Sequence, residues 1–322
     1  MKLQTLISAL VLSCSVAVAA HADDAYPNHP IRVVVPFQPG SSPDATMRFL
    51  GQQLAEVLKQ PIVIDNRPGA GGLLGGDAVA KAPPDGYTLG YLSNQHLLHP
   101  YMVAKMPYDP LKAFAPVSML GRSAQVLLVP SSNPATDLKS FIANAKAQTG
   151  TLKFGSGGIG SPAHLAGQVF ARQAGLNVVH VPYKGAPESV TALMGGHLDY
   201  VIATAGVAAP VVKSGKARAL AVTSDTRHAV FPQVPTLAES FPKGLVLEPW
   251  SVIAAPANTP GAVVDRLNKA FAQVLRDPRT VDYYQKLGGE ILVLTPQETA
   301  TYYSDEARRL SEWVGDVGLQ RN

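Results

Sequence analysis

Short apolar runs alternate along this chain with amphipathic stretches, and glycine, serine or proline marks most changes of pattern. The first apolar run, 31–35, is followed by a stretch in which apolar side chains recur at helical spacing on one face at Met47, Leu50 and Leu54. Further strands are predicted at 61–66, 87–92, 125–129, 152–154, 178–185 with its turn, 199–204, 217–223 and 247–255, and further helices at 75–82, 134–150, 187–194, 262–275 and 296–314. This alternation predicts an α/β fold.

One arrangement occurs twice: a β-like run, a loop of glycine and serine, and a Ser-Pro pair that opens an amphipathic helix. In the first copy Gly40 and Ser41 precede the pair 42–43, and in the second copy the loop 155–160 precedes the pair 161–162. Serine suits the N-cap and proline the first helical turn. The unpaired N–H groups and the dipole of a helix start attract an anion without lysine or arginine. The repeat therefore predicts two facing halves that bind an anionic ligand.

The length favours two domains, since about 300 residues exceed a comfortable single core. We expect a discontinuous first domain, 23–124 plus 248–322, and a second domain, 125–247, each a mostly parallel sheet flanked by helices. Two crossings between the domains would form a hinge. Ligands of open α/β sheets bind at the carboxyl ends of strands, so the loop 37–44 and the strand end 93–95 are expected to meet in the interdomain cleft.

Residues 1–22 are predicted to be a secretory signal, with Lys2 near the start, an apolar stretch at 6–19 and a small-residue cleavage site at 20–22. Cys14 is the only cysteine and lies inside this signal, which excludes disulfides, thiol catalysis and cysteine metal sites in the mature chain. A lipid anchor at Cys14 is the less favoured alternative because 11–13 are a poor context for lipidation. No later segment is long and uncharged enough to span a membrane.

Charge and motifs exclude several classes of protein. The net charge is only +4 and no run of Lys and Arg is interleaved with aromatic residues, so nucleic acid is not an expected partner. The glycines of 155–160 formally match a dinucleotide fingerprint, but the next strand ends at Tyr183-Lys184, where an NAD site would place an acidic residue. We therefore expect no cofactor.

Metal binding and catalysis also lack support in the sequence. His96 and His99 form the only close histidine pair and have no clear third ligand. Gly-x-Ser-x-Gly and His-Glu-x-x-His are absent, although catalytic triads are spatial, so an exported hydrolase or oxidoreductase on a two-lobed scaffold remains the alternative function. His164, in the first turn of the second loop's helix, could contact a ligand or simply pack. Asp44, in the corresponding turn, is expected to order its loop.

Several motifs in this order resemble one bacterial family, and they cover essentially the whole mature chain. They are Pro-Ile-x-Val-Val-Val-Pro-Phe-x-Pro-Gly at 30–40, Asp-Asn-Arg-Pro-Gly-Ala-Gly-Gly at 65–72, Pro-Asp-Gly-Tyr-Thr-Leu at 84–89, Phe-Gly-Ser-Gly-Gly-Ile-Gly-Ser at 154–161, His-Leu-Ala-Gly at 164–167, Val-Pro-Tyr-Lys-Gly at 181–185, Arg-Ala-Leu-Ala-Val at 218–222 and Val-Pro-Thr at 234–236. The chain resembles the extracytoplasmic solute receptors of tripartite tricarboxylate transporters, also called Bug proteins.

The resemblance implies a two-domain periplasmic binding protein of type II, a Venus flytrap, with its ligand in the interdomain cleft. It implies a monomeric receptor, not an enzyme, that binds a small organic carboxylate (a di- or tricarboxylate, an acidic amino acid or an aromatic acid) and delivers it to a large and a small membrane subunit. Family members hold a carboxylate through loop amides, hydroxyls and bridging waters. Carried over to this sequence, the resemblance implies that the carboxylate is bound by Phe37, Gly40, Ser41, Asp44, Ser156, Gly157, Ser161 and His164. We expect the distal part of the solute to contact Ser93, Asn94 and Thr204.

Two departures from the family pattern bear on specificity. Many relatives have a second glycine after Pro-Gly and a threonine before the aspartate, whereas this chain has Ser41-Ser42-Pro43 before Asp44, which predicts a stiffer loop. Many relatives carry an acidic residue where this chain has Thr204. The loss of that charge would suit a less polar or differently charged solute.

Overall fold

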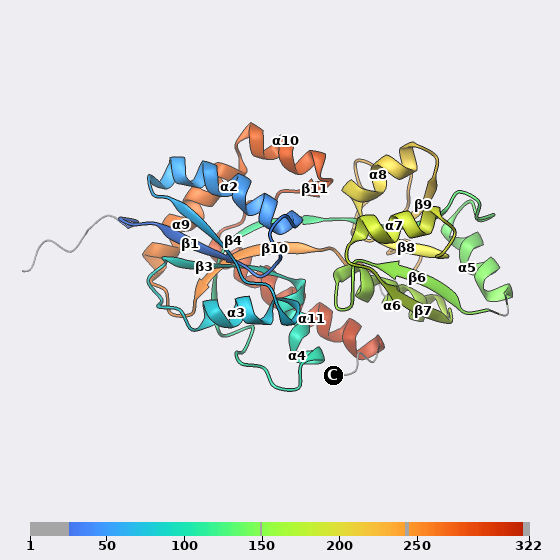
Figure 1. Cartoon of the computed structure of the whole chain (residues 1–322), viewed down its shortest axis with the longest axis horizontal. Helices are drawn as coiled ribbons and strands as arrows, with labels where there is room; N and C mark the ends of the chain where they lie inside the picture. The colour runs from blue at the N-terminus through green and yellow to red at the C-terminus, as the bar shows by residue number, and fades with distance from the viewer. Residues whose placement is uncertain (1–25, 149, 242–244, 318–322) are drawn as a thin grey trace, which may run out of the picture.

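The computed structural model describes residues 26–148, 150–241 and 245–317, so the predicted signal and Cys14 lie outside the described residues. The described chain forms two sheets flanked by helices, side by side (Figure 1). This confirms the predicted α/β class. We call the part built on the six-stranded sheet the first lobe and the part built on the five-stranded sheet the second lobe.

The six-stranded sheet has the order β11-β4-β10-β3-β1-β2. Its strands are β1 (Ile31–Val35), β2 (Ile62–Asn66), β3 (Thr88–Ser93), β4 (Phe114–Ser123), β10 (Trp250–Pro256) and β11 (Gly289–Glu290). Its helices are α2 (Ser42–Leu58), the short 3-10 turn η1 (Ala70–Gly72), α3 (Leu73–Ala80), α4 (Asn94–Met102), α9 (Gly261–Leu275), α10 (Pro278–Lys286) and α11 (Pro296–Val317). Strand β1 runs parallel to β2 and β3, while β10 runs antiparallel to β3 and β4.

The five-stranded sheet has the order β7-β6-β8-β5-β9. Its strands are β5 (Gln125–Pro130), β6 (Leu152–Ser156), β7 (Val178–Pro182), β8 (Tyr200–Thr204) and β9 (Ala217–Val222). Its helices are α5 (Leu138–Ala147), α6 (Pro162–Ala174), α7 (Ala186–Met194) and α8 (Ala205–Lys213). Strand β6 is parallel to both of its neighbours, and β5 is antiparallel to β8 and β9.

The sheets are mixed, which differs from the mostly parallel sheets expected. The parallel strands are those joined by crossover helices, and the antiparallel strands are those next to the crossings between lobes. Five elements were not predicted from the sequence: β4, β11, α4, α8 and α10. The chain passes from one sheet to the other between β4 and β5 and again between β9 and β10. The domain boundaries, 23–124 plus 248–322 for the first domain and 125–247 for the second, remain a prediction.

Three buried apolar clusters hold these layers together. The inner face of α2, with Met47 and Leu50 fully buried, packs with α9 against one face of the first sheet, as its helical spacing requires. Helix α11 contacts β4 and α4 of the first lobe but also α6 of the second, and its Trp313 shares a buried cluster with Leu165. It therefore contacts both lobes, although its residues fall in the range predicted for the first domain.

The two crossings between the lobes are hydrogen-bonded to each other. The Ser123 N–H donates to the Pro249 oxygen at 2.9 Å, and the Thr223 N–H donates to the Gln125 oxygen at 2.8 Å. Both crossings therefore lie in one place, with a lobe on either side (Figure 1). Among the described residues, no helix combines the length and the apolar character that crossing a membrane requires.

Candidate functional site

The predicted ligand-binding residues lie where strands end and helices begin. Strands β1 and β3 of the first lobe lead into α2 and α4, and strands β6 and β8 of the second lobe lead into α6 and α8. Helix α2 directs its N-terminal end toward the second lobe (Figure 1). Helix starts from both lobes therefore lie near the crossings, as the carboxyl-end rule for open sheets predicts.

Asp44 holds the first loop in shape. Its carboxylate, only 3% exposed, accepts hydrogen bonds from the Gly40 N–H at 2.8 Å and from Asn66 Nδ2 at 2.9 Å. Arg48, one turn further along α2, adds a bond from Nε at 3.1 Å and an ion pair at 3.0 Å. The bond from the Arg48 side chain holds the pKa of Asp44 below its usual range despite its burial. These contacts fit the supporting role expected for Asp44.

At the helix start that Asp44 supports, the hydroxyl of Ser41 makes no hydrogen bond to the described residues. Ser41 is the N-cap of α2, yet its side chain makes no capping bond, and the buried Oγ has no hydrogen-bond partner among the described residues. Proline at position 43 supplies no N–H. The Phe37 ring stands edge-on to the ring of Tyr91, with 5.9 Å between the centroids. The α2 start thus offers an unused hydroxyl and the positive end of a 17-residue helix.

The second loop is built by its own hydroxyls. Ser156 is fully buried, and its Oγ lies 2.7 Å from His180 Nε2 and accepts the Gly158 N–H at 3.1 Å. Ser161 caps α6: its Oγ accepts the His164 N–H at 3.2 Å and donates to the Gly158 oxygen at 2.8 Å. A Cβ at Gly157 would come within 3.1 Å of the Ala186 nitrogen. Small residues in this loop therefore permit its close packing on the start of α7.

Two histidine rings lie beneath this loop. His164 stacks on His180 with 3.9 Å between ring centroids, and its Nδ1 accepts the Gly160 N–H at 3.2 Å. Burial, and then the neighbouring His164, lowers the pKa of His180 to about 4; burial also lowers the pKa of His164. Both rings are therefore neutral near pH 7, and His164 is only 8% exposed. Of the two roles left open for His164, packing is the one that these contacts describe.

The residues after β3 bind the protein itself. The Asn94 side chain donates from Nδ2 to the Glu248 oxygen at 3.0 Å, and its Oδ1 accepts the Trp250 N–H at 2.9 Å. Both amide atoms thus tie α4 to the second crossing. The Ser93 N–H donates to His96 Nδ1 at 3.1 Å, and burial lowers the pKa of His96 to about 3. Within the described ranges, no group of three potential metal ligands occurs.

A cavity of about 400 Å³ lies between the lobes next to the α2 start. Of the predicted residues, Thr204 lines it directly, while Ser41 and Phe37 are neighbours of its lining residues in sequence or space. The lining residues are Ser42, Pro43, Thr46, Tyr91, Gly121, Arg122, Ser123, Thr204, Gly206, Val207, Pro249, Trp250, Ser251, Tyr284, Lys286, Leu287 and Gly289. The start of α2 forms one side and the start of α8 the other.

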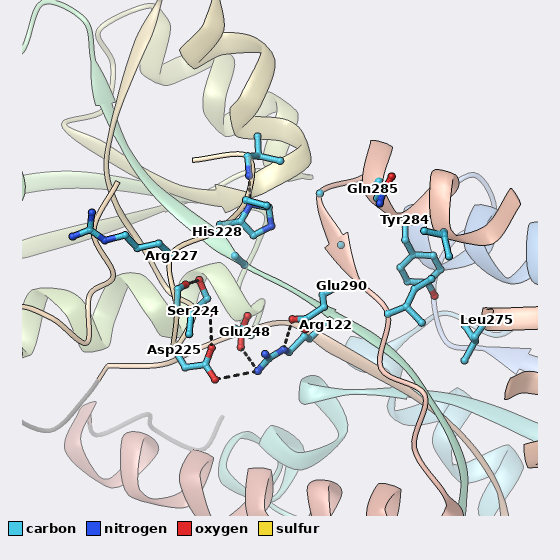
Figure 2. Close-up of a pocket in the computed structure, with 18 of the residues that line it drawn as sticks. Arg122, Ser224, Asp225, Arg227, His228, Glu248, Leu275, Tyr284, Gln285 and Glu290 are labelled. Atoms are coloured by element: carbon cyan, nitrogen blue, oxygen red, sulfur yellow. Dashed lines mark hydrogen bonds and ion pairs between the residues drawn. The ribbon is translucent and has the colours of Figure 1, made fainter. Parts of the chain in front are cut away.

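A larger cavity, of about 770 Å³, lies beside the loop 224–230, the helices α9 and α10, and β11 (Figure 2). It shares Arg122, Tyr284 and Gly289 with the smaller cavity, but none of the predicted ligand-binding residues lines it. Both cavities receive residues from both sides of the crossings, and the smaller one is the candidate site because it adjoins the unused helix start.

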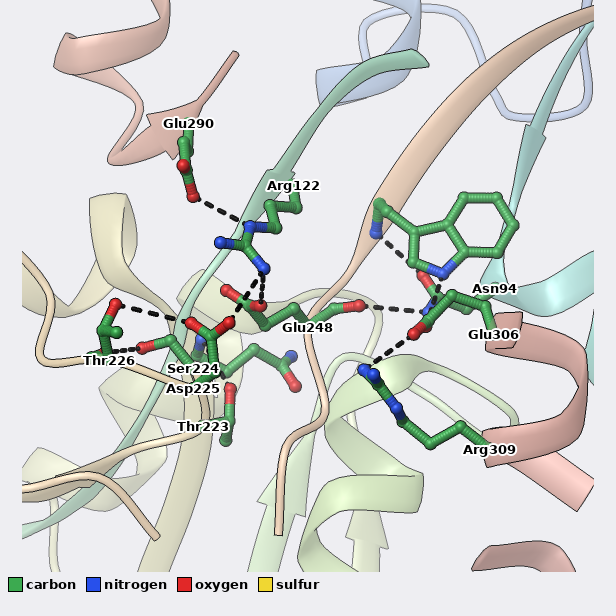
Figure 3. A network of polar contacts seen from close by, with 12 residues as sticks. Asn94, Arg122, Thr223, Ser224, Asp225, Thr226, Glu248, Glu290, Glu306 and Arg309 are labelled. Atoms are coloured by element: carbon green, nitrogen blue, oxygen red, sulfur yellow. Dashed lines mark hydrogen bonds and ion pairs between the residues drawn. The ribbon is translucent and has the colours of Figure 1, made fainter. Parts of the chain in front are cut away.

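Arg122, at the end of β4, is the centre of a polar network that the sequence did not reveal (Figure 3). Its guanidinium lies 2.8 Å from Glu290 of β11, 3.0 Å from Glu248 of the second crossing and 3.5 Å from Asp225, which follows β9. Burial raises the pKa of Glu248 to about 7. Glu248 and Glu290 are 126 and 168 residues from Arg122, so no local pattern could have found the cluster.

A two-lobed α/β fold with helix starts around an interlobe cavity defines a solute-binding receptor of the Venus-flytrap class. The model of the tripartite tricarboxylate transporter family receptor matches residues 46–319. The protein BugT of Bordetella pertussis is 34% identical over 321 residues, covering 99% of this chain and 98% of BugT. The chain therefore belongs to the tripartite tricarboxylate transporter receptor family, the Bug proteins, and is a receptor rather than an enzyme.

Solved structures agree with this assignment. Rpa4515 of R. palustris, solved with adipate, has a TM-score of 0.80 and 30% identity, covering 92% of this chain and 100% of that one. MatC of Rhodopseudomonas palustris, solved with bound malate, has a TM-score of 0.76 and 30% identity, covering 91% of this chain and 100% of that one. Both share the two-lobed fold described above.

Proposed function

We propose that this receptor captures a small organic carboxylate between its lobes and delivers it to the large and small membrane subunits of a tripartite tricarboxylate-type transporter. It does so as a monomer in the periplasm, after removal of residues 1–22. Two relatives solved with a dicarboxylate, adipate in one and malate in the other, support the carboxylate class. The family name supports the transporter partnership.

One observation carries the proposal: the start of α2, with the unpartnered Ser41 hydroxyl, adjoins a cavity that α8 of the other lobe closes. A carboxylate held there gains hydrogen bonds to neutral donors and the favourable end of the helix dipole. Phe37 and Gly40 belong to the loop that leads into α2, and the loop at the start of α6 contains Ser156, Gly157, Ser161 and His164; none of these six lines the cavity, and their contact with the solute is part of the proposal. Asp44 and Asn94 support the site through their contacts with the protein.

Closure of the two lobes around the solute would distinguish the loaded receptor from the empty one. A solute that contacts both lobes only in the closed arrangement shifts the open–closed equilibrium by its difference in affinity for the two states. The membrane subunits would then distinguish loaded from empty receptor by the relative position of the lobes. The hydrogen-bonded crossings, at Ser123–Pro249 and Gln125–Thr223, are where such a movement would turn.

The test is calorimetric titration of residues 23–322 with mono-, di- and tricarboxylates, acidic amino acids and sugars, first on the wild type and then on Ser41→Ala. Because Ser41 Oγ has no partner in the protein, we expect unchanged stability and about 10-fold weaker carboxylate binding, the loss of roughly one hydrogen bond to a charged group. Ser304→Ala, on the exposed face of α11, is the control. Binding of sugars alone, or undiminished carboxylate affinity in Ser41→Ala, would refute the proposed site.

A further inference from the structure

We propose that the preferred solute is a monocarboxylate with an apolar, ring-sized body, and that the cavity between α2 and α8 encloses this body. The inference rests on the proposed function, because it concerns the same interlobe site. It adds the chemical nature of the part of the solute that the α2 start does not hold.

The aromatic and aliphatic part of the cavity lining favours an apolar body. Aromatic rings come from Tyr91, Trp250 and Tyr284, and aliphatic side chains from Val207 and Leu287. None of the residues that line it is acidic. A volume of about 400 Å³ lies within the range of small-molecule pockets, in which apolar walls provide affinity and a few polar groups provide orientation.

Two cations line the cavity, and both are already paired. Lys286 Nζ lies 2.7 Å from the Asp282 carboxylate. The Arg122 guanidinium is surrounded by the carboxylates of Glu290, Glu248 and Asp225 at 2.8, 3.0 and 3.5 Å, so one positive charge faces three acidic groups. A second carboxylate on the solute would find no unpaired cation among the described residues of these walls.

The start of α8 does not provide a second anion site. Its first N–H, that of Ala205, donates to the Ala124 oxygen at 3.0 Å. A Cβ atom at the next residue, Gly206, would overlap the Leu287 oxygen, so this helix end is covered by the first lobe. Thr204, which precedes the helix, is neutral. Of these two helix starts, only that of α2 is therefore equipped for a carboxylate.

A buried hydroxyl completes the wall. Tyr284 is 8% exposed and lines the cavity, and its hydroxyl has no hydrogen-bond partner among the described residues. An unsatisfied buried hydroxyl is costly, and a ligand atom is one way in which proteins satisfy it. A neutral polar substituent on the solute is thus compatible with the cavity.

The test compares dissociation constants of residues 23–322 for benzoate, phenylacetate and cyclohexanecarboxylate with those for adipate, malate and citrate. We expect at least one ring-bearing monocarboxylate to bind 10-fold or more tightly than every polycarboxylate. Tighter binding of adipate, malate or citrate would overturn this inference and leave the proposed function standing. Failure of every carboxylate in the panel to bind would overturn both.

Substitution of Val207 tests whether the ring occupies this cavity. Val207→Trp places an indole in the cavity from the α8 side, so we expect binding of the ring-bearing acids to fall at least 10-fold while propionate binds as to the wild type. Lys213→Trp, which places the same indole on an exposed position at the far end of α8, should bind both as the wild type does. Equal affinity of Val207→Trp and the wild type for the ring-bearing acids would contradict the inference.

Discussion

The backbone N–H of Gly40 donates a 2.8 Å hydrogen bond to the carboxylate of Asp44, four residues further along the chain. This bond closes the turn that leads from β1 into α2. The same carboxylate bonds Asn66 and Arg48, so one side chain connects a loop, a neighbouring strand end and a helix. The position of the α2 start relative to the cavity therefore depends on Asp44, although the carboxylate is bonded to the protein itself.

We expect Asp44→Ala to lower both stability and solute affinity. It leaves the Gly40 N–H, the Asn66 amide and the Arg48 guanidinium without this partner, and a loss of about 1–3 kcal/mol is typical for such deletions. Urea denaturation and calorimetric titration measure the two effects. Asp137→Ala, at the α5 N-cap away from the cavity, should lower stability without changing affinity. Intact affinity in a folded Asp44→Ala protein would show that the loop does not need this anchor.

The supporting role of Asp44 could be read from the sequence because its partners at 40 and 48 are local. The Ser-Pro pair at 161–162 was likewise predicted as the α6 start with Ser161 as N-cap, whereas at α2 the N-cap is Ser41, one residue before the predicted pair. The role of Asn94 could not be read, since its partners are more than 150 residues away. Strand β4 escaped prediction because it is interrupted by polar residues and Gly121, and its antiparallel pairing with β10 is a long-range contact.

The pH dependence of stability should reveal the buried carboxyl of Glu248. Its pKa is raised to about 7, chiefly by burial, with Asp225, Glu290 and Glu306 adding to the rise and Arg122 opposing it. A carboxyl whose folded pKa exceeds its unfolded value stabilises the fold below the unfolded pKa, near 4.5, and this contribution is lost as pH rises toward 7. Glu248→Gln removes the titration, so its unfolding free energy should fall less than that of the wild type between these pH values.

Glu239→Gln provides the matched control for Glu248. Arg227 and the Thr236 N–H lower the pKa of the exposed Glu239 to about 2, so its contribution is present above about 4.5 and lost only as pH falls below that value. Between pH 5 and 8 its urea-denaturation profile should run parallel to that of the wild type. A Glu248→Gln profile that is also parallel would mean that the buried carboxyl titrates in the ordinary range.

The stacked histidines should give a pH dependence of stability opposite to that of Glu248, with stability that rises as pH rises. The pKa of His180 is lowered to about 4, so the folded ring stays neutral while the unfolded ring binds a proton near pH 6.5. This group stabilises the fold above pH 6.5, and the contribution is lost as pH falls toward 4. Following the Hε1 resonance of His180 by NMR, with the urea-unfolded chain as reference, measures both values. A folded midpoint near 6.5 would show that the loop above the ring admits water freely.

Gly206 provides the sharpest test of closure. It lies at the start of α8 in the second lobe, where a Cβ atom would overlap the backbone oxygen of Leu287 in the first lobe. Neither backbone can move aside unless the lobes separate. We expect Gly206→Ala to keep each lobe folded but to hold the lobes further apart, which lowers solute affinity and increases the radius of gyration of the solute-loaded protein in small-angle scattering.

Gly261→Ala is the control for this substitution, since Gly261 also begins a helix but a Cβ atom there would meet nothing within 4 Å. Alanine favours a helix over glycine by up to about 1 kcal/mol, so neither variant should be destabilised through helix propensity. If Gly206→Ala binds the solute as tightly as Gly261→Ala, the contact between Gly206 and Leu287 is not part of the solute-bound state. If affinity falls and the radius of gyration of the solute-loaded protein rises only in Gly206→Ala, then the solute is held by the closed arrangement of the two lobes. The scattering result is needed for this conclusion because Gly206 also lines the cavity.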